Sequence, residues 1–472
     1  MSRFDFTPFL IGASLILLQG CRSPASLTAP DPQTAWKAPE VPIMTVTQKP
    51  EFDFSLPFTL SDCLCEALQN QPLTKKAWNQ SLAQAAYYQK TQATLLPTGG
   101  VTLGVEHQDM KFKSTSSTRT SSKVDQTLKG GGVNLQWLLF SFGARTALIE
   151  AALHQLYGAN FMYNEALQEL ALQVQMSFYQ FQAAKAELVA ALASFEEAKA
   201  VSATVQIKFS TGLADTQEQL RAQAEEASQR YILQATYGTL EAARAQLAKA
   251  MGVPVDLRLD VVSPDLTSPT PLCQATVENW LHEAMSARPS LRAAYENWQR
   301  FESEAKAAKK ALFPQIIATT QAARYNGIRN GLRPDQEVTV GIGLQWNIFD
   351  FAQDRSTAAQ AKYQARAAEE NYRAEQLAVA TDIWKSFYAY QAALGQVQAA
   401  KDFLEASSAA FQATQIGYQT GLKDLTSLLQ AQDMLTKSRF EQVEAYKQAQ
   451  VAWASLIYAA GRLTPDSKSF NT

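Results

Sequence analysis

The chain is poor in charge, in histidine and in long apolar runs, and each shortage excludes a class of protein. Charged residues make up 18% of the 472 residues and the formal net charge is −2, so no nucleic-acid partner is indicated. The three histidines lack the spacing of metal ligands, and neither a glycine-rich phosphate loop nor a nucleophile motif occurs. We therefore expect no metal, no cofactor and no enzymatic activity. Beyond the N-terminus, no apolar run is long enough for a transmembrane helix in the mature chain.

Cysteine is scarce as well, with four residues in the chain. Cys63 and Cys65 are separated by one residue on a predicted helix and point to different faces, so they cannot easily bridge each other. Cys273 lies alone in a predicted linker. A disulfide from Cys273 to one of that pair and unpaired buried thiols are both compatible with this pattern.

The N-terminus has the features of a processed secretory segment. A short apolar run at residues 9–18 precedes Leu18-Gln19-Gly20-Cys21, which resembles a bacterial lipobox. We predict a signal peptide at residues 1–20 and a lipidated Cys21, with ordinary signal cleavage nearby as the alternative. Residues 21–57 are rich in proline and are predicted to form an extended, lipid-anchored tether.

What the chain has instead is an internal duplication. Leu135-Gln136-Trp137 recurs as Leu344-Gln345-Trp346, and the turn Thr211-Gly212-Leu213-Ala214-Asp215 recurs as Thr420-Gly421-Leu422-Lys423-Asp424. Both pairs lie 209 residues apart (344 − 135 and 420 − 211), whereas Pro97 and Pro314 lie 217 apart (314 − 97). The first copy therefore carries eight extra residues (217 − 209) between Pro97 and Leu135. Two equivalent repeats are predicted, and the expected divisions are residues 58–257, a linker at 258–274, residues 275–462 and a tail at 463–472.

Each repeat is predicted to contain a short helix, a second helix, two strands, a very long helix and a returning helix. Prolines interrupt the early helices, at Pro72 and Pro97 in the first repeat, because the residue before a proline is pushed out of the α region. Residues 141–209 contain no proline, and heptad positions such as Leu167, Val174 and Phe181 predict helices packed side by side. About 68 residues at 1.5 Å each give a rod of about 100 Å.

Four strands are predicted from two-residue alternation, at residues 101–111, 132–140, 316–325 and 338–348, with loops at 113–127 and 326–335. The longest alternating run has the length of a tilted strand that crosses a bilayer. Trp137 and Trp346 lie near strand ends, where aromatic residues occur at membrane interfaces. A half-buried hairpin of a soluble protein is the alternative.

The order of strand, junction, long helix, turn and returning helix resembles the outer-membrane efflux protein family typified by TolC, in its lipoprotein branch. The junctions are Phe140-Ser141-Phe142-Gly143-Ala144-Arg145 and Phe349-Asp350-Phe351-Ala352-Gln353-Asp354-Arg355, and the resemblance covers nearly all of residues 58–462. It implies a mainly α fold with a membrane β part, in which each chain adds four strands to a trimeric 12-stranded β-barrel continuous with a long α-helical barrel. The residues argue for an oligomer independently, because four strands cannot close a barrel and open edges are not tolerated in lipid.

The resemblance also implies a function and partners. The protein would be the outer-membrane exit duct of a tripartite efflux system, working with a periplasmic adaptor and an inner-membrane transporter of RND or ABC type. It would lie in the outer membrane, anchored by lipid and extending into the periplasm. The outer channel of a type I protein secretion system is an alternative with the same duct. A lipid-tethered structural coiled-coil protein of the periplasm is an alternative from another class.

The resemblance further suggests functional residues. The two turns would dock the adaptor through Gly212, Leu213, Asp215, Gly421, Leu422 and Asp424. Gly212 and Gly421 are expected to have a positive φ at the two helix reversals. A latch near the turns would join Glu218 to Tyr418 and Lys423. The acidic constriction of the family falls on Ser427 and Gln430, which are uncharged in this chain, so cation affinity is not expected there.

Overall fold

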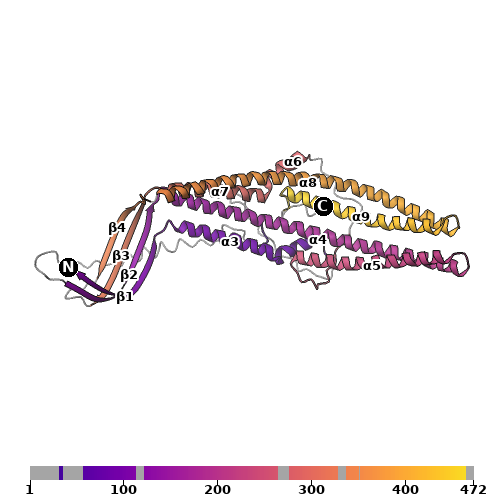
Figure 1. Ribbon diagram of the computed structural model, residues 1–472, viewed down its shortest axis with the longest axis horizontal. Helices are drawn as coiled ribbons and strands as arrows, with labels where there is room; N and C mark the ends of the chain where they lie inside the picture. The colour runs from indigo at the N-terminus through magenta and orange to yellow at the C-terminus, as the bar shows by residue number, and fades with distance from the viewer. Residues whose placement is uncertain are drawn as a thin grey trace. The chain divides into compact units, whose positions relative to one another are not determined.

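The computed structural model contains the same six elements twice in the same order (Figure 1), and it describes residues 31–35, 57–112, 122–263, 276–327, 336–349 and 351–463. In the first repeat the elements are α2 (Leu60–Asn70), α3 (Pro72–Ala93), β1 (Thr98–Phe112), β2 (Ser122–Phe140), α4 (Ala144–Ser210) and α5 (Thr216–Met251). In the second repeat they are α6 (Val277–Ala287), α7 (Pro289–Lys310), β3 (Gln315–Gly327), β4 (Glu337–Gln345), α8 (Phe351–Gln419) and α9 (Leu425–Ala459). The predicted signal peptide, Cys21 and Cys273 lie outside the described residues, as do most of the tether and of the tail.

The chain divides into two compact units. The first unit contains the end of α3, the four strands, the start of α4, the end of α7 and the start of α8, within residues 82–158 and 294–372. The second unit contains α2, α5, α6 and α9 with the remaining parts of α3, α4, α7 and α8, within residues 28–81, 159–293 and 373–472.

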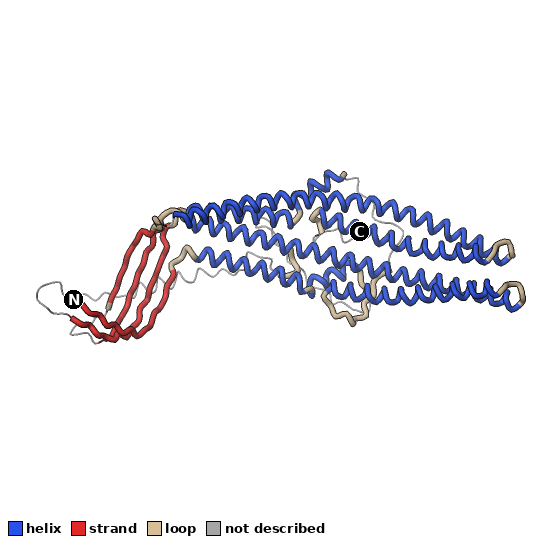
Figure 2. The backbone as a smooth tube through the Cα atoms, viewed as in Figure 1, coloured by secondary structure: helices blue, strands red, loops and turns tan. Residues whose placement is uncertain are grey.

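In the first unit, the strands form one antiparallel sheet in chain order, β1-β2-β3-β4, drawn in red in Figure 2. β2 pairs with β3 as well as with β1, so the sheet joins the two repeats directly. Val133 of β2 lies opposite Val101 of β1 and Ala322 of β3, and Ala318 of β3 lies opposite Ile342 of β4. Cross-strand partners share a face of a sheet, so the apolar members of the alternating pattern gather on one face.

All four strands differ from their predicted ranges. β1 and β3 extend beyond the predicted ranges at both ends. β2 begins at Ser122, ten residues before the predicted start at residue 132, and so includes part of the predicted loop. Its glycine run at 130–132 resembles a loop in sequence, but β1 supplies backbone partners for it regardless of side chain. β4 ends at Gln345 rather than at residue 348, because its partner strand begins at Gln315, which lies opposite Gln345.

The turns that lead from helix to sheet are held in the same way in both repeats. α3 and α7 end three residues before Leu96 and Phe313, where the sequence predicts their ends. The indole Nε1 of Trp137 donates a hydrogen bond to the carbonyl of Leu95 at 2.8 Å, and that of Trp346 donates to the carbonyl of Leu312 at 3.2 Å. Each tryptophan therefore fixes the turn that precedes its own pair of strands.

In the second unit, α5 returns beside α4 and α9 returns beside α8 (Figure 1). The predicted heptad positions Leu167, Val174 and Phe181 of α4 are at most 1% exposed. They or their neighbours on α4 pack in one cluster with Leu247 and Met251 of α5 and with residues of α2. The heptad spacing thus corresponds to the buried side of α4, as expected for helices packed side by side.

None of the described helices combines the length and the apolar character needed to cross a membrane. The described residues contain no cluster of His, Cys, Asp or Glu that could hold a metal ion. Cys63 and Cys65 do not bridge each other, and burial is the main reason that the pKa of the Cys63 thiol is raised to about 12.

Candidate functional site

The repeated Thr-Gly-Leu-x-Asp segments form two nearly identical helix-reversing turns in the second unit, which we call tip 1 (Thr211–Asp215) and tip 2 (Thr420–Asp424). Gly212 and Gly421 have φ angles of +76° and +79°, which confirms the left-handed conformation expected for glycine at a helix end. In tip 1 the Leu213 amide donates to the Lys208 carbonyl at 2.8 Å, and in tip 2 the Leu422 amide donates to the Gly417 carbonyl at 2.8 Å. Both turns are therefore Schellman motifs.

The aspartates of the tips begin the returning helices. A carboxylate oxygen of Asp215 accepts a hydrogen bond from the Glu218 amide at 2.7 Å, and Asp424 accepts one from the Ser427 amide at 3.2 Å. The Ser427 hydroxyl also donates to Asp424, and these bonds lower the pKa of the Asp424 carboxyl. Ser427, predicted to line a constriction, thus uses its hydroxyl in a helix cap, while Gln430 is exposed.

The leucines of the tips have no comparable local role. Leu213 is 77% exposed and Leu422 is 82% exposed. Each has a second exposed apolar residue in its own hairpin, Ile207 at 65% and Ile416 at 62%. Because the turn geometry depends on the glycine, the threonine and the aspartate, these apolar side chains are available for contact with another molecule.

The two hairpins, α4–α5 and α8–α9, contact each other next to the tips. A buried cluster joins residues of all four helices: Val201, Val205, Ala222, Phe411, Tyr418, Leu425, Leu428, Ala431 and Leu435. Tyr418 is 5% exposed, and its hydroxyl has no hydrogen-bond partner among the described residues. Nζ of Lys208 lies 3.8 Å from the centre of the Tyr418 ring and 3.0 Å from the Tyr418 carbonyl oxygen.

Of the predicted latch residues, Glu218 lies near enough to Tyr418 for its charge to act on the phenol. Burial, and then the nearby charge of Glu218, raise the pKa of Tyr418. Lys423 instead lies along its own hairpin, where a Cβ added at Gly417 would meet its Cγ at 2.7 Å. It forms no ion pair within the described part of the chain. The basic residue that touches Tyr418 is Lys208, which the sequence interpretation missed. The sequence signal that could have found it is the lack of a basic residue in the last turn of α8.

The sheet of the first unit has two chemically different faces. One face exposes large apolar side chains, among them Leu103 at 85% and Ile342 at 74%. The opposite face is mostly small or neutral and polar where its side chains are described: Gly100, Thr102, Gly104, Gly132, Asn134, Thr319, Gln321, Gly341 and Gly343. Its exceptions are the apolar Leu138 and Ile317 and the charged Glu337. At Gly104 and Gly343 an added Cβ would meet nothing within 4 Å. An apolar face and a polar face on one sheet suit two different solvents.

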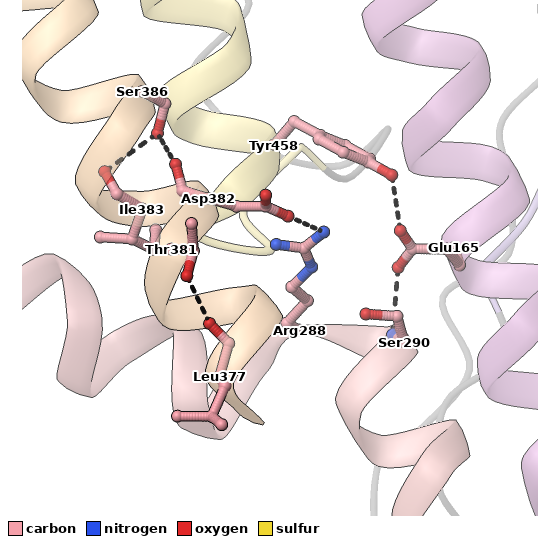
Figure 3. A network of polar contacts seen from close by, with 9 residues as sticks. All are labelled: Glu165, Arg288, Ser290, Leu377, Thr381, Asp382, Ile383, Ser386 and Tyr458. Carbon is pink, nitrogen blue, oxygen red and sulfur yellow. Dashed lines mark hydrogen bonds and ion pairs between the residues drawn. The ribbon is translucent and has the colours of Figure 1, made fainter. Parts of the chain in front are cut away.

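A polar network in the second unit links four helices near the end of α9 (Figure 3). Glu165 of α4 accepts a hydrogen bond from the Tyr458 hydroxyl at 2.6 Å and another from the Ser290 amide at 3.1 Å. Arg288, whose side chain is 9% exposed, pairs with Asp382 of α8 at 3.0 Å. Burial and the charge of Glu165 raise the pKa of Tyr458, so it remains a hydrogen-bond donor at neutral pH. The network stabilises packing and contains no nucleophile or metal-ligand set.

This combination of a two-faced sheet, long helices and twin tips matches a known family. The model described as outer membrane efflux protein matches residues 64–253 and 280–462 of the chain. The chain therefore belongs to the outer membrane efflux protein family, a TolC-like family of outer-membrane transport channels.

Individual relatives agree with this assignment. Protein CyaE of Bordetella pertussis (strain Tohama I) is 23% identical over 461 residues, which cover 96% of this chain and 94% of the relative. The Campylobacter jejuni CmeC outer membrane channel superposes with a TM-score of 0.76 at 15% identity, covering 93% of this chain and 97% of that one. The open state of the Neisseria gonorrhoeae MtrE outer membrane channel gives a TM-score of 0.73 at 20% identity, covering 87% and 90%. At these identities the structures show that the fold is shared.

Proposed function

We propose that three copies of this chain form a duct through the outer membrane and that this duct is the exit channel of a tripartite efflux system. The observation that carries the proposal is the two-faced sheet. Its apolar face suits lipid, and its mostly small and polar, glycine-rich face suits a water-filled interior. β1 and β4 are the outer strands of a four-stranded sheet, and further copies would pair these edges, as lipid requires.

Three is the smallest number of copies that yields a conducting duct. Two copies would give about eight strands, a barrel whose interior is filled by side chains, whereas three give about 12. The helices would continue the duct into the periplasm. A purified trimer, established by light scattering in mild detergent, is expected; a stable monomer would contradict this assembly.

The tips are the proposed docking site for a periplasmic adaptor, which would couple the duct to an inner-membrane transporter of RND or ABC type. Leu213 and Leu422 support this role because their side chains are exposed and play no part in the turns. Replacing both with Ser should abolish export while leaving the trimer and its conductance intact. Tyr231→Ser is the matched control, since Tyr231 is also 77% exposed but lies away from the tips on α5. Equal loss of export in both variants would argue against docking at the tips.

The lipid anchor on Cys21 remains a prediction from the lipobox-like segment. Metabolic labelling with a fatty acid should mark the wild type and not Cys21→Ser. Labelling that persists in the variant would refute it. The barrel would still anchor the protein in the membrane, so the variant is expected to assemble.

The latch of Glu218, Tyr418 and Lys423 and the constriction at Ser427 and Gln430 also remain predictions. The proximity of Glu218 to Tyr418 supports the first, and the absence of charge at the two constriction positions supports the second. The double variant Glu218→Gln, Tyr418→Phe should raise single-channel conductance. Multivalent cations should not block the wild-type channel from the tip side, unlike a channel with an acidic ring.

Two measurements test the proposed function as a whole. Purified protein in a planar bilayer should show single-channel conductance, and its absence would contradict the duct. Deleting the protein from its cell should increase sensitivity to exported toxic compounds. Loss of an exported polypeptide with unchanged sensitivity would instead indicate the outer channel of a type I secretion system.

A further inference from the structure

The apolar face of the sheet ends in basic side chains, at the end of the sheet away from the junctions with α4 and α8. Along β2 this face carries apolar side chains from Trp137 to Val133 and then Gly131, and the next residue on it is Lys129. Lys129 is exposed. It is the first charged residue that β2 places on the apolar face beyond Trp137.

A second cation lies beside Lys129 on the neighbouring strand. On β3, Asn326 lies opposite Lys129, and Arg324 is two residues away on the same face. Arg324 and Lys129 are therefore diagonal neighbours, and such neighbours lie about 7–8 Å apart, within reach of long side chains. Arg324 is exposed as well. We call these two residues the basic corner of the sheet.

The basic corner adjoins exposed apolar side chains of β1. Val105 lies opposite Lys129 and is 68% exposed. Leu103 is 85% exposed and lies over Gly131, where it would meet an added Cβ. A cation next to exposed leucine and valine suits the boundary of a membrane, because its apolar stem can lie among acyl chains while its charged end reaches the headgroups.

The place of the corner along the strands fits this boundary. Trp137 and Lys129 are eight residues apart (137 − 129), which gives about 26 Å along the strand and about 20 Å across the membrane at a tilt of about 40°. The lysine side chain extends this distance toward the height of about 25 Å that is usual for the apolar band of such sheets. Trp137 and Lys129 therefore lie near opposite borders of the band.

An acidic row separates the basic corner from the rest of the β1–β2 hairpin. Asp109 is on the same face as Val105, four residues farther along β1 (109 − 105), and the register pairs it with Asp125. Four residues of strand span about 13 Å. The cations thus lie at the edge of the apolar band, and the carboxylates lie well beyond it. An anion held at this edge would meet the cations first.

We propose that Lys129 and Arg324 form a binding site for the headgroup phosphates of a lipid in the outer leaflet, a phosphorylated glycolipid of the lipid A type. The proposal rests on the proposed function, which directs the helices into the periplasm and so places the basic corner in the outer leaflet. A guanidinium binds phosphate through two parallel hydrogen bonds, and a lysine adds a point charge. One such site in each copy would fix the depth of the assembly in the membrane.

Lipid binding to the purified protein tests the site. The protein is placed in phosphatidylcholine nanodiscs and titrated with fluorescent diphosphoryl lipid A. Lys129→Gln and Arg324→Gln should each weaken binding about fivefold, and the double variant about 25-fold, as expected for one and two basic residues at an anionic lipid surface. Arg324→Lys, which keeps the charge, should lose less than Arg324→Gln. Lipid A without phosphates should bind weakly and equally to all of these proteins.

The matched control is the double variant Lys76→Gln, Lys362→Gln. It removes two exposed lysines, one on α3 and one on α8, both outside the sheet, and it should bind lipid A as the wild type does. An equal loss in this control, or unchanged binding in the double variant of the basic corner, would overturn the site. Displacement of the lipid by millimolar inorganic phosphate would also overturn it, because the corner would then hold free phosphate rather than a lipid.

Planar-bilayer recording of the same wild-type preparation separates this proposal from the proposed duct. A conducting protein whose lipid binding does not depend on Lys129 and Arg324 would overturn the lipid site and leave the duct standing. A protein that shows the expected losses of lipid binding but does not conduct would contradict the duct and leave the lipid site standing. Light scattering should show that each variant has the oligomeric state of the wild type, so that a loss of binding reports on the site.

Discussion

Both repeats pack the end of their returning helix against the start of an earlier helix, but the side chains at the two junctions differ. Each returning helix ends in a left-handed glycine, Gly252 or Gly461, that lies against the residue before a helix-starting proline. An added Cβ would come within 2.9 Å of the Gln71 backbone in the first repeat and within 2.8 Å of the Arg288 backbone in the second. The backbone arrangement has therefore been kept in both copies.

The side chains at these two junctions have diverged. Nε2 of Gln71 donates to the carbonyls of Lys249 and Ala250 at 3.2 and 3.0 Å, and so caps the end of α5. Arg288 points instead to Asp382 of α8 (Figure 3). The first repeat has a neutral cap within the repeat, whereas the second has a buried charge that depends on a partner in another helix. The tips show the same pattern, with nearly identical turns but a lysine in the last turn of the preceding long helix only in the first repeat, where it is Lys208. Duplication here preserved backbone geometry and left side-chain chemistry free to specialise.

The largest expected effect separates glycines by what surrounds them. Gly252→Ala and Gly461→Ala should each lower the free energy of unfolding by about 2–5 kcal/mol, from the left-handed conformation and from overpacking against backbone. Gly212 and Gly421 also have a positive φ, but an added Cβ there would meet nothing within 4 Å. Gly212→Ala and Gly421→Ala should therefore each lower the free energy of unfolding by only about 1–2 kcal/mol. Urea unfolding followed by far-UV circular dichroism measures all four. Equal losses would show that the junction contacts carry no weight.

The next effect contrasts the faces of the sheet. Ile342→Arg places a charge on the apolar face and should cost about 2–4 kcal/mol if that face meets the middle of the bilayer. Gly343→Arg, its neighbour on the other face, should cost less than about 1 kcal/mol and alter ion selectivity instead. Reversible unfolding from lipid vesicles gives both values. The opposite order would assign the apolar face to the interior of the duct.

Substitutions at the two junctions should differ in how their cost in stability depends on salt. Asp382→Asn leaves the buried Arg288 without its charged partner, and because Asp382 is 48% exposed we expect a moderate cost of about 1–3 kcal/mol. Gln71→Ala removes two hydrogen bonds and should cost about 1–2 kcal/mol. High salt should lessen the Asp382→Asn difference by screening the wild-type pair, and leave Gln71→Ala unchanged. Salt dependence of Gln71→Ala would contradict a neutral cap.

The smallest effect concerns pH. Burial is the main cause that raises the pKa of Glu225 above its ordinary value of 4.5, and the charge of Asp433 adds to it. A carboxyl with a raised folded-state pKa stabilises the fold below its ordinary pKa, and that contribution is lost as the pH rises through the folded-state pKa. Glu225→Gln should therefore raise the melting temperature slightly at pH 7 relative to the wild type, and not at pH 4.

The second repeat has Met434 at the equivalent position (434 − 225 = 209), so it lacks this dependence. Glu226→Gln is the control, because it removes an ion pair with Arg230 at 2.8 Å rather than a buried carboxyl. A rise at pH 7 in that control, or none in Glu225→Gln, would assign the pH dependence elsewhere.

Local rules explain what could be predicted. Each of these rules acts within a few residues. They are the two-residue alternation, the heptad spacing, and the threonine, glycine and aspartate around a helix end. For that reason the strands, the buried side of α4 and the left-handed glycines of both tips followed from the sequence. The early start of β2 did not, since the glycines at 130–132 become a strand only when β1 lies beside them.

By itself the sequence determined the duplication, the order of elements in each repeat, the conformation of both tips and membership of the outer membrane efflux protein family. Only the tertiary structure decided where β4 ends, that β2 pairs with β3 across the repeats, and that Lys208 rather than Lys423 touches Tyr418. These facts depend on which backbone or ring lies opposite a residue, and the partners of Lys208 and β2 are about 200 positions away along the chain. The sequence of the last turn of α8 shows that it contains no basic residue. Only the folded structure shows that Lys208 of α4 lies beside it.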